Sequence, residues 1–457
     1  MQKRWLFSFL SFALLSLISI SARAQSPLTG QDFNTNLLLA QQLMEENRFM
    51  AARALINQLP QEQLTETKRA EMEFLKASVA LKMDEKEAPE QVDQFEFMYP
   101  TFSRIEELRN AKGDYFFNHG KYKNAAEAYA GVKASLLNTD DRNAYFFKYG
   151  YSQFMLNNPK EAKNLFYKVK DSKSTYAPSA TYYYAHINYD EKNFPSALKG
   201  FLSLKDDPTF KAIAPYYICQ IYYQEKDYEK LLEIGPQLFK DAQGPRKNEI
   251  AKILGDAHFK LEQYPQSIEY LEFYRANSQG GYQKSDYYQL AFAHMKAGNN
   301  TEAIKYFEKV GNKQDSLSQY ALYNLGTCYL KTQQKEFAGK AFYAAYQLDV
   351  NQEIREDALF NFAKISYELS NDPYNRAITA INSYLEAYPK STRKKEAYSY
   401  LVNLFLSSKN YKGALVAIEN IEDRTTELNK AYQLIAFNRA IELYNESRFN
   451  EAQELLE

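Results

Sequence analysis

Apolar residues recur along the chain with helical spacing inside a much longer repeat. A small residue is followed by a large apolar residue after three or four positions, by a second small residue after twelve, and by a second large residue after sixteen. In one copy these residues are Gly113, Phe116, Ala125 and Tyr129. Residues three, four or seven positions apart share one face of an α-helix. The pattern therefore predicts pairs of amphipathic helices joined by short turns.

The second small residue of the pattern, twelve positions after the first, can be followed through ten copies at intervals of 34 to 39 residues. It is small in nine of these copies. The series is Ala125, Ala162, Ala197, Leu231, Ser267, Ala303, Ala338, Ala377, Ala414 and Ala452. A further copy at Ala52 lies two periods before Ala125, so about twelve copies are expected. Because one helix pair cannot bury its apolar side alone, neighbouring pairs must stack on one another.

One copy carries the pattern of a known family most fully. The run Asn324-Leu325-Gly326, followed by Tyr329, Ala338 and Phe342, resembles the tetratricopeptide repeat. In the numbering of that family, the small residues are positions 8 and 20 and the large ones are positions 11 and 24. The position of the family's tryptophan holds Phe146, Tyr287, Leu322 or Tyr398. The resemblance implies an all-α, right-handed α-α superhelix, a tetratricopeptide solenoid of about twelve helix-turn-helix repeats.

The first residues are typical of a secretory signal. Lys3 and Arg4 precede an apolar run over residues 5–20, and Ala22-Arg23-Ala24 follows as a small-x-small cleavage site. The alternative is a membrane anchor, but the run is shorter than the ~20 apolar residues that span a bilayer. We predict a signal peptide over residues 1–24, cleaved after Ala24, and an exported product without a membrane span. The periplasm is the expected location.

The remaining chain is expected to form one array without a domain linker. Residues 25–34 are predicted to be a short flexible lead-in, and residues 35–457 a continuous tetratricopeptide array with clear repeats from about residue 106. The last repeat stops within its second helix, which leads us to expect a truncated chain or a gene fragment.

Composition narrows the classes of partner. The 56 basic residues are balanced by 57 acidic residues, which gives no indication of nucleic-acid binding. The chain has 39 Tyr and 30 Phe, and most of these rings are expected to pack between helices. Cys219 and Cys328 lie three repeats apart and are expected to be buried free thiols rather than a disulfide.

The sequence contains no recognisable catalytic or metal-binding motif. A phosphate-binding glycine loop, a nucleophile elbow, an H-E-x-x-H pair and a C-x2-C pair are all missing from it. His258 and His294 occupy the same repeat position and are predicted to be packing residues. We therefore predict no enzyme activity, no catalytic residue, no cofactor and no metal.

The resemblance also implies a binding groove. In tetratricopeptide superhelices the first helix of each repeat lines the concave side, chiefly with positions 2, 5, 9 and 12. The aromatic residues and one histidine that the pattern places on this side are Phe147, Tyr151, Phe154, Tyr182, His186, Tyr189, Tyr216, Tyr223, Tyr288, Phe292, Tyr320, Tyr323, Phe360 and Tyr367. They suit a bound peptide, since Tyr gives contact area at low entropic cost. Alternatively, the rings only pack against one another.

The sequence thus favours a protein-interaction scaffold of the cell envelope that binds a protein or peptide segment in this groove. One junction, Tyr388-Pro389-Lys390-Ser391 with Ala397, is similar to that of exported tetratricopeptide proteins that serve outer-membrane assembly or cell division. It implies an association with an outer-membrane or envelope complex. Three alternatives remain: a carbohydrate-binding protein, an envelope-structural protein, or the regulatory part of a longer protein.

Overall fold

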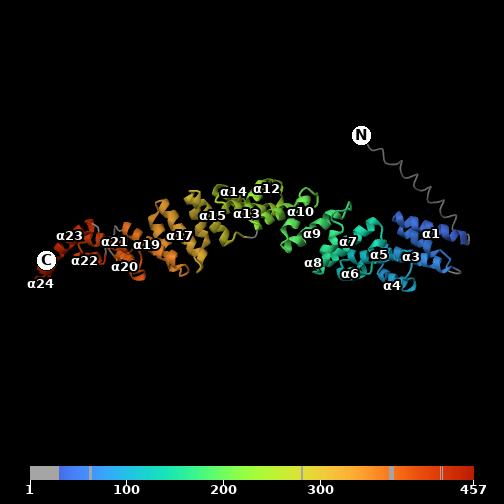
Figure 1. The fold of residues 1–457 in the computed structure, drawn as a ribbon, viewed down its shortest axis with the longest axis horizontal. Coiled ribbons are helices and arrows are strands. Elements are labelled where there is room, and N and C mark those ends of the chain that lie inside the picture. The colour runs from blue at the N-terminus through green and yellow to red at the C-terminus, as the bar shows by residue number, and fades with distance from the viewer. Residues whose placement is uncertain (1–29, 61–63, 279–280, 370–374, 422–423, 425) are drawn as a thin grey trace, which may run out of the picture. The chain divides into compact units, whose positions relative to one another are not determined.

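The computed structural model describes residues 30–457 except 61–63, 279–280, 370–374, 422–423 and 425. These residues form 24 α-helices and one short 3₁₀ helix, and no β-strand occurs among them (Figure 1). The predicted all-α class is confirmed. The expected signal peptide and residues 25–29 lie outside the described residues.

The chain divides into two compact units, Met1–Ala214 and Pro215–Glu457. In the first unit the helices are α1 (Gly30–Glu45), α2 (Phe49–Asn57), α3 (Glu66–Lys82), α4 (Ala88–Met98), α5 (Ile105–Asn118), α6 (Tyr122–Ala130), η1 (Ala134–Leu136), α7 (Thr139–Met155), α8 (Pro159–Tyr167), α9 (Ala177–Asp190) and α10 (Phe194–Leu204). The second unit contains α11 (Ala214–Gln224), α12 (Tyr228–Asp241), α13 (Gly244–Lys260), α14 (Tyr264–Asn277), α15 (Lys284–Lys296), α16 (Asn300–Val310), α17 (Ser316–Lys331), α18 (Lys335–Gln347), α19 (Gln352–Glu368), α20 (Asn375–Ala387), α21 (Lys394–Ser407), α22 (Tyr411–Glu419), α23 (Thr426–Asn445) and α24 (Phe449–Glu454).

Odd- and even-numbered helices form twelve consecutive pairs in the described part of the chain. From α1 to α10, and again from α12 to α24, each helix packs against the helix before it and the helix after it. The short turns make the two helices of a pair antiparallel. This arrangement of stacked helix pairs is the predicted α-α solenoid.

The turn inside a pair has the same conformation in all eleven pairs whose turn is described. In eleven pairs the second residue after the first helix has a positive φ between 57° and 85°, and in nine of them it is not glycine. The next N–H then donates to a carbonyl five residues earlier, for example from Arg48 to Leu43 and from Gln334 to Tyr329, both at 2.8 Å. This is a Schellman motif, which satisfies carbonyls at the end of the helix. The turn of the pair α19/α20 lies outside the described residues.

Small residues let the two helices of a pair approach closely. Ala125, Ala162, Ala303 and Ala338, all at position 20, are completely buried. The large residue at position 24 is at most 2% exposed in nine pairs. These nine residues are Ile56, Tyr129, Phe166, Phe201, Leu271, Phe307, Phe342, Ile381 and Ile418. Positions 8, 20 and 24 thus have the roles predicted from the sequence.

The pair α11/α12 reverses this arrangement. Leu231 occupies position 20 and is completely buried, whereas Gly235 occupies position 24. A Cβ atom built on Gly235 would lie 2.4 Å from the Leu254 side chain of α13. The small residue has moved by one helical turn, and the close approach that it allows is to α13 of the next pair.

Two further expectations can be compared with the structure. Cys219 and Cys328 are free and completely buried, as predicted, and burial raises the pKa of their thiols to about 12 and about 11. Residues 25–34 were expected to form a flexible lead-in, but α1 begins at Gly30. The reason is Phe33, which is 1% exposed and belongs to the first core cluster.

We expect Gly326→Ala to destabilise the second unit. The new Cβ atom would lie 2.9 Å from the Phe342 ring, and overpacking of a core costs about 1–3 kcal/mol. Gly339→Ala is the matched control, because its Cβ atom would meet Ile365 at an ordinary 3.5 Å and alanine favours the helix by about 1 kcal/mol. Thermal unfolding followed by circular dichroism should show a lower Tm for the first variant only. Equal Tm values would contradict the close-packing account.

Candidate protein-interaction face

All fourteen residues predicted for the groove lie on first helices of pairs. In the first unit, α7 carries Phe147, Tyr151 and Phe154, and α9 carries Tyr182, His186 and Tyr189. In the second unit, α11 carries Tyr216 and Tyr223, α15 carries Tyr288 and Phe292, α17 carries Tyr320 and Tyr323, and α19 carries Phe360 and Tyr367. Tyr320 is 40% exposed and Phe360 is 5% exposed, whereas the other twelve are half-buried.

In the first unit these rings pack mainly against one another. Tyr182 stacks on Phe210 with ring centroids 4.8 Å apart, and Phe147 stacks on Tyr176 at 5.0 Å. Such contacts bury much of each ring, as in an ordinary core. The predicted groove residues were expected either to bind a peptide or to pack against other rings. The observed contacts of this unit are packing contacts.

The centre of this aromatic cluster is Tyr183, which sequence reasoning missed. Its ring lies 5.2 Å from Tyr151, 5.2 Å from Phe154 and 5.4 Å from Phe166. Burial raises its pKa to about 12, with a smaller contribution from the Tyr151 hydroxyl. Three consecutive tyrosines occur at 182–184. Their identity alone gave no signal as to which ring is central.

In the second unit, polar bonds join successive first helices at intervals of one repeat. Asn324 Nδ2 of α17 donates to the Tyr288 hydroxyl of α15 at 3.4 Å, 36 residues earlier. Tyr288 also stacks on Phe292, with ring centroids 6.0 Å apart. The hydrogen bond fixes the hydroxyl end of a ring whose other side is packed.

The same relation continues from α17 to α21. The Tyr323 hydroxyl donates to Asp357 of α19, 34 residues later. Asp357 in turn forms an ion pair with Arg393, which immediately precedes α21. The Arg393 guanidinium lies 4.9 Å from the Phe360 ring centroid. One carboxylate therefore connects three consecutive pairs.

Between α19 and α21 the contact is both aromatic and polar. The Tyr367 and Tyr400 rings stack with centroids 4.7 Å apart, and Asn403 Nδ2 donates to the Tyr367 hydroxyl at 3.4 Å. We call the set of Tyr288, Phe292, Tyr320, Tyr323, Asn324, Asp357, Tyr367, Arg393, Tyr400 and Asn403 the first-helix face. Of its members outside the predicted fourteen, Asn324, Asp357, Arg393 and Asn403 could have been found from polar residues spaced 34–36 apart.

The half-buried carboxyl group of Asp256 forms part of the same series of bonds. Gln289 of α15 donates to Asp256 Oδ1 of α13 at 2.8 Å, beside the ion pair between Lys252 and Asp286, also at 2.8 Å. Burial raises the pKa of the Asp256 carboxyl to about 6, although the bond from Gln289 and the charge of Lys252 act in the opposite direction.

His258 and His294 are packing residues, as predicted. They are 9% and 6% exposed, and their rings stack on Tyr270 at 5.5 Å and Tyr306 at 5.6 Å. Burial lowers the pKa of His294. Among the described residues, no cluster of three His, Cys, Asp or Glu side chains is arranged to hold a metal ion.

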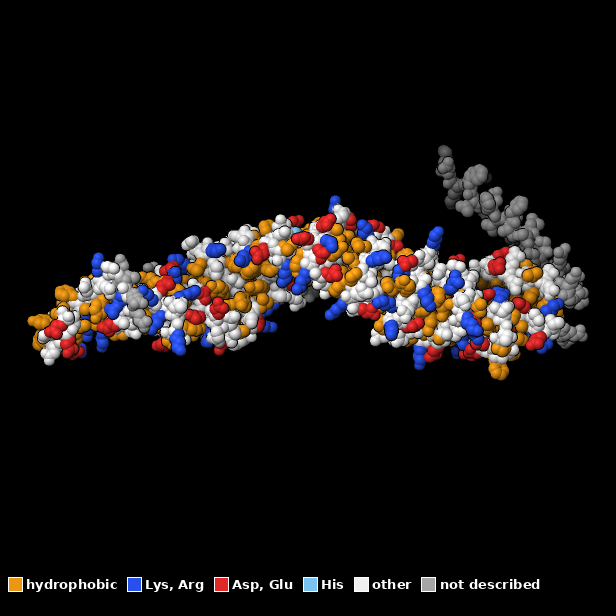
Figure 2. Space-filling model, in the orientation of Figure 1, with side chains coloured by type: hydrophobic (Ala, Val, Ile, Leu, Met, Phe, Trp, Pro, Cys, Tyr) orange, Lys and Arg blue, Asp and Glu red, His pale blue; other side chains and the backbone are white. Residues whose placement is uncertain are grey.

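The visible surface of each unit mixes both signs of charge. Lys, Arg, Asp and Glu side chains alternate with hydrophobic ones rather than forming one large field (Figure 2). None of the described helices combines the length and apolarity needed to cross a bilayer.

A family model described as tetratricopeptide repeat matches residues 288–353, which extend from α15 to the start of α19. This part of the chain is similar to the tetratricopeptide repeat family. Arrays of this family are typically non-catalytic scaffolds for protein–protein interaction, and the matched repeats support that class of function. Such proteins bind protein or peptide partners.

Three solved structures illustrate the range of similar chains. YrrB, described as a tetratricopeptide protein with an unusual peptide-binding site, is 16% identical with a TM-score of 0.34, covering 47% of this chain and 100% of YrrB. A tetratricopeptide protein from Parabacteroides merdae is 18% identical with a TM-score of 0.34, and the match covers 56% of this chain and 98% of that one. The third structure, Naa15/Naa10 bound to HypK-THB, is 11% identical with a TM-score of 0.42. The match covers 93% of this chain and 67% of that one. A comparison with curated proteins found no match.

We expect the stability of the protein to depend on the protonation of Asp256. Between about pH 4, where a carboxyl of the unfolded chain ionises, and about pH 6, the native state keeps a proton that the unfolded state has lost. The free energy of unfolding should therefore fall as the pH rises through this window. Asp256→Asn, which keeps the oxygen that accepts from Gln289, should remove this decline and raise Tm above pH 6.

The measurement is Tm at pH 4 to 8 for the wild type and the variant. Asp206→Asn is the control, because that side chain is 87% exposed and its replacement should leave the pH profile unchanged. Parallel profiles for the wild type and Asp256→Asn would contradict the assignment.

Proposed function

We propose that this protein is an exported, non-catalytic scaffold of the cell envelope and that its first-helix face binds an extended segment of a protein partner. One observation carries the proposal. Hydrogen bonds and ring contacts one repeat apart hold Tyr288, Tyr323, Tyr367 and Tyr400 in fixed positions along four consecutive first helices. A row of fixed, half-buried aromatic rings is the kind of surface on which binding energy concentrates.

Preorganisation favours the second unit over the first. A tyrosine ring that is already fixed loses little entropy on binding, and its amphipathic side provides both contact area and hydrogen bonding. Tyr320 lies among these rings on α17 and is 40% exposed, so it can contact a partner directly. In the first unit the corresponding rings are engaged with one another. An extended polypeptide could contact successive pairs and use the same chemistry in each.

The test places a photo-crosslinking residue at Tyr320 or at Phe337, which is 52% exposed on the second helix α18. Crosslinked protein partners should appear at position 320 and not at 337. Tyr320→Ala should then weaken binding of the captured partner by about tenfold or more, as at an interface hot spot. Phe337→Ala is the matched control and should bind normally.

Some results would count against the proposal. Equal crosslinking at positions 320 and 337 would contradict binding at the first-helix face. Retention on immobilised glycans without any crosslinked protein would favour a carbohydrate-binding function instead.

The export part of the proposal is supported by the basic, apolar and small-residue order of residues 1–24. We expect the chain recovered from the periplasm of a Gram-negative host to begin at Gln25. Ala24→Arg should block this cleavage, because the site requires a small residue. Intact mass determination measures both. A wild-type chain that retains residues 1–24 would contradict the cleavage site.

A further inference from the structure

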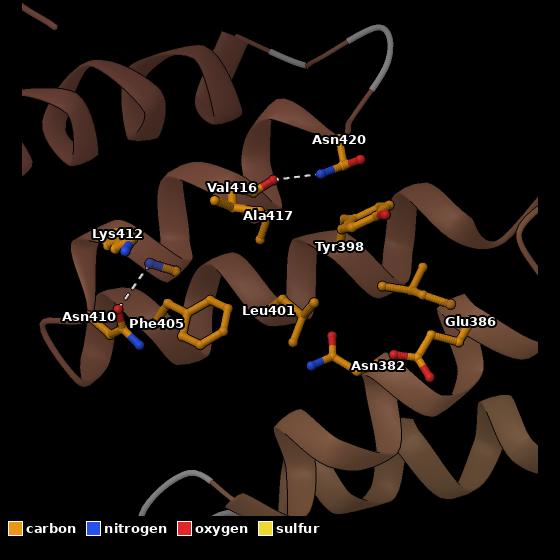
Figure 3. Close-up of a pocket in the computed structure, with 12 residues that line it drawn as sticks. Asn382, Glu386, Tyr398, Leu401, Phe405, Asn410, Lys412, Val416, Ala417 and Asn420 are labelled. Carbon is orange, nitrogen blue, oxygen red and sulfur yellow. Dashed lines mark hydrogen bonds between the residues drawn. The ribbon is translucent and has the colours of Figure 1, made fainter.

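A groove lies between α20, the second helix of its pair, and the following pair α21/α22. Its volume is about 560 Å³, and Leu401 and Ala417 form an apolar floor, both 3% exposed. The Phe405 ring forms one wall, while Asn382 and Glu386 approach from α20 (Figure 3). All lining residues belong to the second unit.

The groove is open because two residues are smaller than their counterparts one repeat earlier. Tyr343 lies five residues after Ala338, as Asn382 lies five residues after Ala377. Phe362 directly precedes the small residue of α19, as Leu401 directly precedes Val402 of α21. Between α18 and α19, the Tyr343 and Phe362 rings meet with centroids 4.8 Å apart. The corresponding space beside Asn382 and Leu401 has no such ring pair among the described residues, and the groove volume of about 560 Å³ is large enough to admit an aromatic side chain.

Two amide groups at the edge of the groove have spare hydrogen-bonding capacity. Asn410 Oδ1 accepts from the Gly413 N–H at 2.9 Å, which leaves its Nδ2 able to donate. Asn420 Nδ2 donates to the Val416 carbonyl at 2.8 Å, which leaves its Oδ1 able to accept. One donor and one acceptor are what a backbone peptide group needs.

The two ends of the groove carry opposite charges. Lys412 and Glu386 are exposed and project from α22 and α20 on opposite sides of it (Figure 3). Lys412 lies near enough to Glu451 for its charge to contribute to the lowered pKa of that carboxyl, after the larger effect of the bond from Arg448. A ligand with an acidic group at one end and a basic group at the other would match both ends of the groove.

We propose that this groove binds an extended polypeptide segment of a partner that inserts a Tyr or Phe side chain beside Asn382. The segment carries an acidic residue toward Lys412 and a basic residue toward Glu386. The inserted ring takes the place that Tyr343 fills one repeat earlier. This site uses another face of α21 than Tyr400 and Asn403, so it does not depend on the first-helix face.

The experiment measures fluorescence anisotropy of two dye-labelled peptides, Asp-Gly-Tyr-Gly-Lys and Lys-Gly-Tyr-Gly-Asp, with the chain lacking residues 1–24. We expect one of them to bind, and Asn382→Tyr, which refills the groove, to weaken it by about tenfold or more. Asn382→Ala keeps the groove open and should bind within about twofold of the wild type. Circular dichroism and Tm verify that each variant is folded.

A charge exchange provides a test that does not alter the packing. The double variant Glu386→Lys with Lys412→Glu changes only exposed side chains, and it should shift the preference between the two peptides by about threefold. Binding that is unaffected by both Asn382→Tyr and the charge exchange would overturn the proposal. The proposal would also be overturned if neither peptide bound, whether or not a chitooligosaccharide bound in the same assay.

Discussion

Every feature of this protein depends on the close contact between the two helices of a pair. At that contact a small side chain on one helix faces a large one on the other, as Gly326 faces Phe342 and Gly113 faces Tyr129. The Schellman turn fixes the angle at which the second helix returns. The pair is then a rigid unit, but it still has an apolar side that only the next pair can cover.

Stacking leaves two kinds of surface with different chemistry. On the first-helix face, polar atoms join successive pairs, so a change at Asp357 would affect Tyr323 and Arg393 together. Between a second helix and the first helix of the next pair, the contacts depend on the volume of individual side chains. A Tyr there closes the space, as at position 343, and an Asn leaves it open, as at position 382. The repeat sets the positions of the helices, and a few differences in side-chain size between repeats determine where the space between adjacent pairs stays open.

The aromatic richness of the chain has a structural explanation before a functional one. In the first unit, rings such as Tyr151, Tyr182 and Tyr183 mostly contact one another. In the second unit, comparable rings have hydroxyl groups bonded to the following helix and one exposed member, Tyr320. The same residue type therefore builds a core in one place and a fixed, accessible surface in another.

The sequence by itself determined the helix pairs, their number and the buried positions, because small and large residues at fixed spacing have one way to pack between two helices. It also placed all fourteen candidate residues on first helices. It could not distinguish Tyr182 from Tyr183, nor show that Leu231 and Gly235 exchange roles. Only the tertiary structure decided these points, together with the bonds across one repeat and the groove beside Asn382. Each depends on which side chains from separate pairs meet. The repeat pattern describes packing within one pair, so it cannot predict the size or orientation of the side chains that the next pair brings to the contact.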